Sequence, residues 1–354
     1  MSNKLYKKII VKVGTNVISR EDGLVDEKVL KSLVTQIARL KNDGVGVILV
    51  SSGAVGAGKA SIKLAEKSDS VVTRQVLASV GQIKLINTYS KLFAEHNYHC
   101  AQVLATKEDF RDRTHYLNMK NCFAALLHDE IVPIVNENDV TSVSELMFTD
   151  NDELAGLIAS MMGVDALVIL TNVDGVFAGE EVLATIDAKT DYQRYIMPEK
   201  SLFGRGGMLT KCNIAEKLSH MGITTHIANG KARDILLDIL HGKEVGTKFL
   251  SHKTLSSVKR WIAHSDGYEK GVVYINKGAK DALLSKEKAT SLLPIGVVKV
   301  DGDFEKGDIV RIQTEDNLDL GFGISQYSAQ KAREFTGQKG KKPIIHYDYL
   351  FLKK

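Results

Sequence analysis

The chain of 354 residues is 44% apolar and carries a formal charge of +4, so it can bury a large core and is long enough for two domains. Residues 1–258 hold 30 basic and 30 acidic side chains, whereas residues 259–354 hold 17 basic against 13 acidic ones. Charge alone therefore gives no support for nucleic-acid binding, because the small excess includes several lysines near the C-terminus, where a solvated tail is the ordinary explanation.

The cysteines and the lengths of the apolar runs indicate the cellular compartment in which the protein is expected. Cys100, Cys122 and Cys212 lie far apart and match no metal or redox spacing. Cys100 and Cys122 fall within apolar patterns, which predicts buried thiols. The N-terminal residues lead directly into a strand without a signal peptide, and no apolar run is long enough to span a membrane. We therefore expect a soluble, cytoplasmic protein with no membrane partner.

Strands and helices alternate through residues 7–240. A strand at 7–13 ends in Gly14, and the apolar spacing within 26–43 predicts an amphipathic helix. A nearly continuous apolar strand at 45–50, as expected where both faces of a parallel strand are covered, leads into the small-residue loop 51–58. Further helices are expected at 71–96, 115–128, 154–162 and 232–240, and one more follows the glycine-rich loop 203–211 and ends at about 221. Further strands are expected at 98–104, 131–135, 166–170 and 223–228. A polar insertion is expected at 176–201. This order predicts a three-layer αβα sandwich with a mostly parallel sheet over residues 1–258.

The pattern changes after Trp261. Short strands separated by turns such as Asp301-Gly302, with two short helical pieces between them, predict a small β-rich domain over residues 259–354. The strands are expected at 272–275, 297–300, 309–312 and 321–324, and the helical pieces near 279–285 and 329–336.

The stretch 131–157 carries the clearest functional signal. A buried strand runs directly into the tetrad Asn-Glu-Asn-Asp at 136–139, and the tetrad Asp-Asn-Asp-Glu at 150–153 stands where the next helix begins. Asn and Asp also cap helices and build turns, which is the ordinary structural explanation for either tetrad. Two tetrads, one at a strand end and one at a helix start, favour a ligand site at the carboxyl edge of the sheet.

Two lysines beside glycine-rich loops predict phosphate binding. Lys12 stands at a strand end, two residues before Gly14, and Lys211 closes the loop 204–211. A snorkelling strand-end lysine and a mobile glycine turn are the plainer explanations of these features. The chain lacks GxxxxGK[ST] and GxGxxG, so it is neither a P-loop protein nor a bearer of the dinucleotide fingerprint. No Ser-His-Asp or Cys-His arrangement is visible. Taken with the two tetrads, the lysines favour phosphoryl transfer, which needs charge neutralisation and alignment more than covalent help.

Six motifs, in their order and spacing, resemble the amino acid kinase family: KVGTN, VILVSSGAVGAG, VPIVNENDV, TDNDEL, LTNVDGV and GRGGMLTK. The segments VKRWI, TSLLPIGVVKVDGDFEKGD and GISQYSA resemble the PUA domain. The match covers nearly the whole chain. It implies transfer of the γ-phosphoryl group of ATP to the side-chain carboxylate of L-glutamate, the first step of proline synthesis. A carboxylate is already ionised at pH 7, so this reaction needs no general base.

The resemblance also implies a role for each matching position. Lys12 and Lys211 would stabilise the charge on the transferring phosphoryl group, and Asp152 would organise both lysines. Glutamate would be held by Ser52, Gly53, Asn136, Asp139, Asp150 and Asn151. ATP would contact Lys12, Gly14, Thr171, Asn172, Arg205, Gly206, Gly207, Met208, Leu209, Thr210 and Lys211. Mg²⁺ would be bound mainly by the ATP phosphates, with no direct protein ligand.

Three features depart from the family pattern. Thr149 stands where Gly is common, Asn172 stands where Asp is common, and the insertion after Val176 lacks the usual Asp-Pro. They concern chiefly the nucleotide side of the site and leave the reaction class unchanged.

The resemblance implies partners as well: proline as a feedback inhibitor, a homo-oligomer of two or four chains, and functional coupling to glutamyl phosphate reductase. Two alternatives remain open at this point. One is a related kinase acting on aspartate, acetylglutamate, carbamate or a nucleoside monophosphate. The other is an RNA-binding or regulatory protein with an inactive kinase domain, although the slight basic excess and the lack of interleaved aromatic and basic residues argue against RNA binding.

Overall fold

The computed structural model describes most of the chain in two compact units, Met1–Thr254 and Leu255–Lys354. The described residues are 5–20, 22, 24–62, 70–141, 150–187, 190–195, 207–251, 257–263, 267, 269–285 and 290–353. The domain boundary predicted at 258/259 lies close to this division and stays a prediction. No helix among the described residues is long and apolar enough to cross a membrane.

The first unit is built on an eight-stranded sheet with the order β3-β4-β2-β1-β5-β9-β10-β8. Neighbouring strands from β3 to β9 pair in parallel, and only β10 runs antiparallel to β9. The mostly parallel sheet predicted from the alternation is thereby confirmed. The strands are β1 (Lys8–Val13), β2 (Gly46–Ser51), β3 (Cys100–Ala105), β4 (Val132–Glu137), β5 (Ala166–Thr171), β8 (Thr185–Ile186), β9 (Thr224–Asn229) and β10 (Thr247–Phe249).

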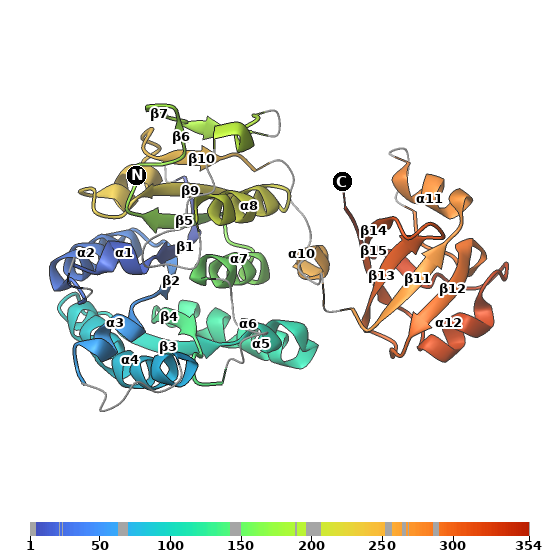
Figure 1. The fold of residues 1–354 in the computed structure, drawn as a ribbon, viewed down its shortest axis with the longest axis horizontal. Helices are drawn as coiled ribbons and strands as arrows, with labels where there is room; N and C mark the ends of the chain where they lie inside the picture. Colours follow the sequence, from blue (N-terminus) through green and yellow to red (C-terminus); the bar gives the residue numbers. More distant parts are fainter. Residues whose placement is uncertain are drawn as a thin grey trace. The chain divides into compact units, whose positions relative to one another are not determined.

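Helices cover both faces of this sheet, so the predicted three layers are confirmed (Figure 1). The first face packs against α2 (Glu27–Asn42), α4 (Ser70–Ala94) and α9 (Ile235–Leu240), whose apolar side chains share one core with it. The second face packs against α6 (Arg113–His128), α7 (Asn151–Met162) and α8 (Met208–Ser219). Short helices α1 (Thr15–Ile18), α3 (Ala54–Lys59) and α5 (Lys107–Arg111) follow strand ends.

Strand β1 brings a lysine into the interior. Ile9, Val11 and Val13 belong to the core under α2 and α4. Because successive side chains of a strand alternate between the two faces of the sheet, Lys12 points to the opposite face, which α7 covers. Lys12 is only 5% exposed, so its charge must find a partner there.

Helix α3 replaces the loop that the small residues 51–58 predicted. It packs closely on α4, since a Cβ atom on Gly58 would overlap the Leu77 carbonyl and one on Gly81 would overlap the Ala54 carbonyl. The small residues therefore let two helix backbones touch, a tertiary requirement that looks like loop composition in the sequence.

Other local predictions also need correction. Helix α5 was not predicted, and the insertion 176–201 contains the short strands β6 (Phe177–Ala178) and β7 (Glu181–Val182), β8, and the 3₁₀ turn η1 (Gln193–Tyr195). The buried-thiol prediction is wrong for Cys122, which is exposed, and for Cys100, which is half-buried, whereas Cys212 is buried. Helix α6 buries Tyr116 and Phe123 instead.

The second unit is a five-stranded sheet with the order β12-β11-β13-β14-β15, which confirms the predicted β-rich domain. Its elements are α10 (Ser257–Ala263), β11 (Gly271–Ile275), α11 (Lys277–Leu284), η2 (Pro294–Gly296), β12 (Val297–Gly302), β13 (Ile309–Thr314), β14 (Asp319–Ser325), α12 (Ala329–Phe335) and β15 (Ile345–Leu352). Strand β15 and helix α10 complete the fold, and neither of them was predicted. Ile262 of α10 packs on Phe322 of β14. Lys353, predicted to lie in a solvated tail, forms an ion pair of 2.6 Å with Asp319.

Candidate active site

The centre of the candidate site is the buried carboxylate of Asp152, in the first turn of α7. Its Oδ1 lies 2.7 Å from Lys12 Nζ, and its Oδ2 lies 3.0 Å from Lys211 Nζ. The lysines come from β1 and from the first turn of α8. A buried ion costs several kcal/mol unless it is paired, so the three groups hold one another in place. Two ammonium groups against one carboxylate leave one net positive charge beyond the carboxyl ends of the strands.

Asp152 stays ionised in this arrangement. Burial acts to raise its pKa, but the ammonium groups of Lys12 and Lys211 outweigh burial and lower the pKa to about 2. A carboxylate with so low a pKa is a poor proton acceptor near pH 7. The geometry makes Asp152 a fixed anion between two cations.

Asp150 starts helix α7 and places Asp152. Its Oδ1 accepts hydrogen bonds from the backbone N–H groups of Asp152 and Glu153, at 2.9 and 3.2 Å. Its Oδ2 is buried and has no hydrogen-bond partner among the residues that the structure describes. Burial, and then the neighbouring charge of Asp152, raise the pKa of Asp150 to about 6. A buried carboxyl oxygen without a partner is available to a ligand.

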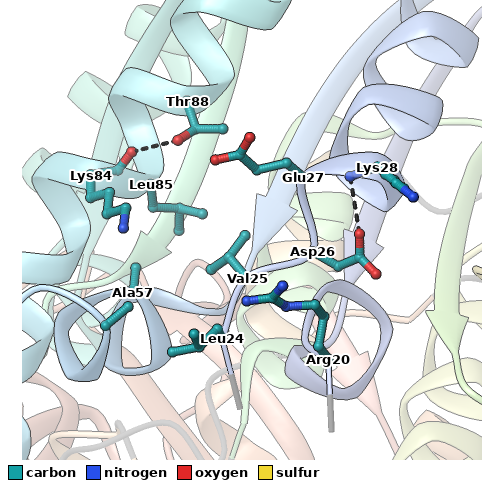
Figure 2. Close-up of a pocket in the computed structure, with 11 residues that line it drawn as sticks. Arg20, Leu24, Val25, Asp26, Glu27, Lys28, Ala57, Lys84, Leu85 and Thr88 are labelled. Carbon is teal, nitrogen blue, oxygen red and sulfur yellow. Dashed lines mark hydrogen bonds between the residues drawn. The ribbon is translucent and has the colours of Figure 1, made fainter. Parts of the chain in front are cut away.

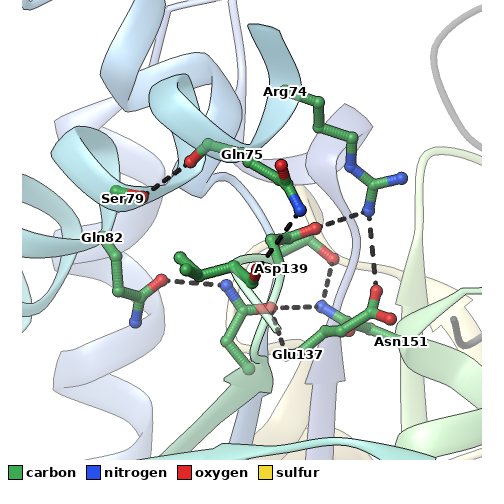
Figure 3. A network of polar contacts seen from close by, with 10 residues as sticks. Arg74, Gln75, Ser79, Gln82, Glu137, Asp139 and Asn151 are labelled. Atoms are coloured by element: carbon green, nitrogen blue, oxygen red, sulfur yellow. Dashed lines mark hydrogen bonds and ion pairs between the residues drawn. The ribbon is translucent and has the colours of Figure 1, made fainter. Parts of the chain in front are cut away.

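A cluster of amide and hydroxyl groups adjoins this helix start. The Nδ2 atom of Asn151 donates to Ser52 Oγ at 2.8 Å and to Asn136 Oδ1 at 2.9 Å. The Nδ2 atom of Asn136 in turn donates to Gln82 Oε1 at 2.9 Å. The ends of β2 and β4 and the start of α7 thus meet in one network (Figure 3).

An arginine contacts the two acidic residues that follow Asn136 in the same network, Glu137 and Asp139. Arg74 of α4 places Nη2 2.6 Å from Asp139 Oδ1 and 3.5 Å from Glu137 Oε2. The sequence reasoning missed both Arg74 and Gln82 because they lie on a helix more than 50 residues before the tetrad 136–139. One signal could have identified Arg74: it is the only basic residue between Lys67 and Lys84.

The residues predicted for the nucleotide lie at the ends of β1 and β5 and at the start of α8. Gly14 caps α1 beside Lys12, since a Cβ atom there would lie 3.4 Å from Lys12 Nζ. Gly53, which was predicted for glutamate, caps α3 with a φ of 108°, a conformation that favours glycine. At the end of β5, Thr171 Oγ1 donates to Asn172 Oδ1 over 3.4 Å. Gly207 caps α8, and Met208, Leu209, Thr210 and Lys211 form its first turn. Thr149, Arg205 and Gly206 lie outside the described residues.

The structure therefore brings the predicted residues together in two groups. Lys12, Lys211 and Asp152 form the lysine–aspartate centre, and Ser52, Asn136 and Asn151 form the amide cluster. Asp150 joins the groups through the backbone of α7. Within the described part of the chain, no side-chain hydrogen bond or ion pair joins Thr171 or Asn172 to either group.

A cavity of about 480 Å³ lies away from these groups, between α2, α3 and α4 and the segment before α2 (Figure 2). Leu24, Val25, Ala57 and Leu85 form its apolar wall, and charged side chains such as Arg20 surround them. None of the predicted site residues lines this cavity, so we do not assign it to the candidate active site.

The lysine–aspartate centre suits an anion whose charge grows during a reaction, because its cations are fixed in advance by a buried partner. The amide cluster and the nearby carboxylates suit a polar, partly cationic acceptor. This combination fits phosphoryl transfer to a small polar molecule.

Comparison with known proteins agrees with this class. Residues 7–229 match the amino acid kinase family and residues 271–347 match the PUA domain. The chain belongs to the amino acid kinase family.

The curated relatives are more specific. The chain is 57% identical to a glutamate 5-kinase of Chlorobaculum tepidum, over 98% of both chains. It is 51% identical to a glutamate 5-kinase of Bacteroides thetaiotaomicron, over 98% of this chain and 99% of that one. Among solved structures, a Giardia carbamate kinase shares the fold with a TM-score of 0.51 and 16% identity, covering 70% of this chain and all of that chain.

Proposed function

We propose that this chain is a glutamate 5-kinase, which transfers the γ-phosphoryl group of ATP to the side-chain carboxylate of L-glutamate in the first step of proline synthesis. The observation that carries the proposal is the pair of lysines held by buried Asp152, at 2.7 and 3.0 Å. Its support from the comparisons is the glutamate 5-kinase name of relatives at 57% and 51% identity.

In this proposal the lysines carry the chemistry. The transferring phosphoryl group spreads negative charge over its oxygens, and Lys12 and Lys211 neutralise that charge from fixed positions. Asp152 holds the two ammonium groups, so little reorganisation is needed as the reaction proceeds. The acceptor is a carboxylate and is ionised at neutral pH, so the site needs no general base.

Glutamate is proposed to bind across the amide cluster. Its ammonium group suits Asp139 and Asp150, the two carboxylates assigned to it, and its reacting carboxylate suits the positive charge of the lysine–aspartate centre. Hydrogen bonds from Ser52, Asn136 and Asn151, with the backbone at Gly53, complete the proposed set.

ATP is proposed to bind beyond β1, β5 and the start of α8, along Gly14, Thr171, Asn172 and residues 205–211. The Mg²⁺ proposed to accompany it would be bound mainly by the phosphates. One observation supports this: both oxygens of Asp152 face lysines. Asp150 Oδ2 is a buried oxygen without a hydrogen-bond partner among the described residues.

A direct assay tests the function. Purified protein with Mg-ATP would be supplied with L-glutamate, aspartate, acetylglutamate or no acceptor, and ADP release would be measured. Added hydroxylamine would trap an acyl phosphate as a hydroxamate. Glutamate-dependent ADP release with a trapped hydroxamate is expected; turnover with another acceptor alone, or with none, would contradict the proposal.

We also propose inhibition by proline, functional coupling to glutamyl phosphate reductase and a cytoplasmic location, all on the strength of the family resemblance. L-Proline added to the assay should lower the rate most at low glutamate, because the proposed inhibitor acts near the glutamate site. A rate that proline leaves unchanged at every glutamate concentration would remove inhibition from the proposal.

A homo-oligomer is proposed from one exposed surface of the first unit. Val72, Val76 and Ile83 are exposed on α4, and their spacing places them along one side of the helix. Helix α4 also contacts β3, the edge strand of the eight-stranded sheet, which exposes Leu104. An open sheet edge beside apolar side chains favours association with a second copy. Sedimentation of the protein and of Ile83→Glu tests this: the variant should form a smaller species.

A further inference from the structure

Three side chains of α4 hold the segment 136–140. Arg74 pairs with Asp139 at 2.6 Å, Gln75 Nε2 donates to the carbonyl oxygen of Val140 at 3.2 Å, and Gln82 Oε1 accepts from Asn136 at 2.9 Å (Figure 3). The segment begins in β4 and continues into the turn after it. It contains both of the residues of the first tetrad that are proposed to bind glutamate.

The spacing of these contacts matches on the two sides. Arg74 and Gln82 are eight residues apart, a rise of about 12 Å on an α-helix. Asn136 lies in β4 and Asp139 in the turn after it, so the three steps between them span at most about 10 Å, and the long Arg74 side chain bridges the remaining distance to Asp139. The earlier helix residue meets the later segment residue, so the two stretches run antiparallel. Contacts at both ends fix the position and the orientation of the segment.

The charges match as well. Glu137 and Asp139 are almost fully buried, and the Arg74 side chain, 27% exposed, lies between them. Arg74 is the only partner of the Asp139 side chain among the residues that the structure describes. Arg74 thus joins Glu137 at the end of β4 to Asp139 in the turn that follows. Gln82, by taking the Nδ2 of Asn136, turns Oδ1 toward Asn151.

We propose that Arg74 and Gln82 form an α4 clamp, which positions the segment 136–140 and thereby sets the affinity for the acceptor. This inference rests on the proposed function for its substrate. Both are positioning residues: they act through Asp139 and Asn136 and lie away from the transferring phosphoryl group. Their effect should therefore appear in acceptor binding and should spare the chemical step.

Steady-state kinetics of Arg74→Ala, Arg74→Lys and Gln82→Ala test the clamp. Arg74→Ala should raise the KM for glutamate about 10- to 100-fold, the range expected for a lost charge-assisted hydrogen bond. Its kcat and its KM for ATP should stay within about threefold of wild type. Arg74→Lys should recover part of the loss, because lysine keeps the charge without the planar fork. Gln82→Ala should show a smaller rise of about 3- to 10-fold.

Lys84→Ala is the matched control. Lys84 lies on the same helix, is exposed, and is not among the α4 side chains that contact the segment 136–140 in the described structure. Its kinetic constants should equal those of wild type. An unchanged KM for glutamate in Arg74→Ala, or equal losses for both substrates without recovery in Arg74→Lys, would overturn the clamp.

Amide hydrogen exchange separates a failed clamp from a failed function. Without any substrate, Arg74→Ala should speed exchange of the amides at 138–141, and Lys84→Ala should leave it unchanged. If no acceptor supports turnover in the wild type, the proposed function is wrong. The hydrogen-exchange measurement still shows whether Arg74 positions the segment 136–140. Equal exchange in Arg74→Ala and wild type would reject it.

Discussion

The lysine–aspartate centre and the segment 136–140 lie in the same unit but are built differently. We call this segment the acceptor segment, because it holds two of the residues proposed to bind glutamate. Lys12, Asp152 and Lys211 stand on a central strand and on the first turns of two helices, and all three are buried or nearly so. The acceptor segment leaves its strand at Glu137 and is held from outside by side chains of α4. In the proposed function, charges on strands and helix starts act on the phosphoryl group, whereas a segment held by α4 recognises the acceptor. Changes at the first region should affect kcat and stability; changes at the second should affect KM.

The largest expected effect is on stability, at Asp152. Asp152→Asn keeps the shape of the side chain but leaves Lys12 and Lys211 without their counter-charge. Breaking a buried ion pair on one side costs about 3–5 kcal/mol, so the free energy of unfolding should fall by that order. Urea unfolding at pH 7 measures it. A loss as small as that of an exposed pair, such as Lys31–Glu95 in a Lys31→Ala variant, would contradict the coupling of the three groups.

The next effect is on catalysis, at Lys12. Lys12→Ala should lower kcat by about 10²–10³, as expected when one preorganised cation is removed from a developing charge. The KM for glutamate should change little, since Lys12 lies outside the amide cluster. Lys84→Ala serves as the control. An unchanged kcat in Lys12→Ala would remove Lys12 from the mechanism.

The dependence of stability on pH should distinguish Asp150, whose pKa is raised, from Asp152, whose pKa is lowered. The pKa of Asp150 is raised to about 6 in the folded protein, against about 3.9 in an unfolded chain. The stability that it contributes is therefore complete below about pH 4 and is lost as pH rises through about 6. Asp150→Asn retains the oxygen that caps α7 but cannot ionise. The free energy of unfolding of this variant, relative to wild type, should rise by about 1–3 kcal/mol between pH 4 and pH 7. A difference that does not vary with pH would contradict the raised pKa.

The smallest effect is expected at Asp139. Asp139→Ala should raise the KM for glutamate about tenfold with little change in kcat, because Asp139 is assigned to binding. Arg74 is partly exposed, so its loss of a partner costs little stability. A selective rise in the KM for ATP would show that the two substrates are placed the wrong way round.

Much of the site could be predicted because its residues are local exceptions to their patterns. Lys12 interrupts an apolar strand, and the tetrads 136–139 and 150–153 stand where a strand ends and a helix begins. A charge or a run of amides at such positions has few structural uses. Arg74 and Gln82 were missed because a single polar residue on a long helix is common, and its meaning depends on what it faces.

The sequence by itself determined the alternation of strands and helices in the first unit, the mostly parallel sheet, the β-rich character of the second unit and the candidates Lys12, Asp152 and Lys211, since periodicity and polar strand ends are local properties. Only the tertiary structure decided that Asp152 bridges two lysines whose positions in the chain are 199 residues apart, and that side chains of α4 contact the segment 136–140. The tertiary structure also decided the glycine crossing of α3 and α4, the exposure of Cys122 and the last strand of the second unit. Such contacts depend on the register and packing of elements distant in the chain, which no local pattern encodes.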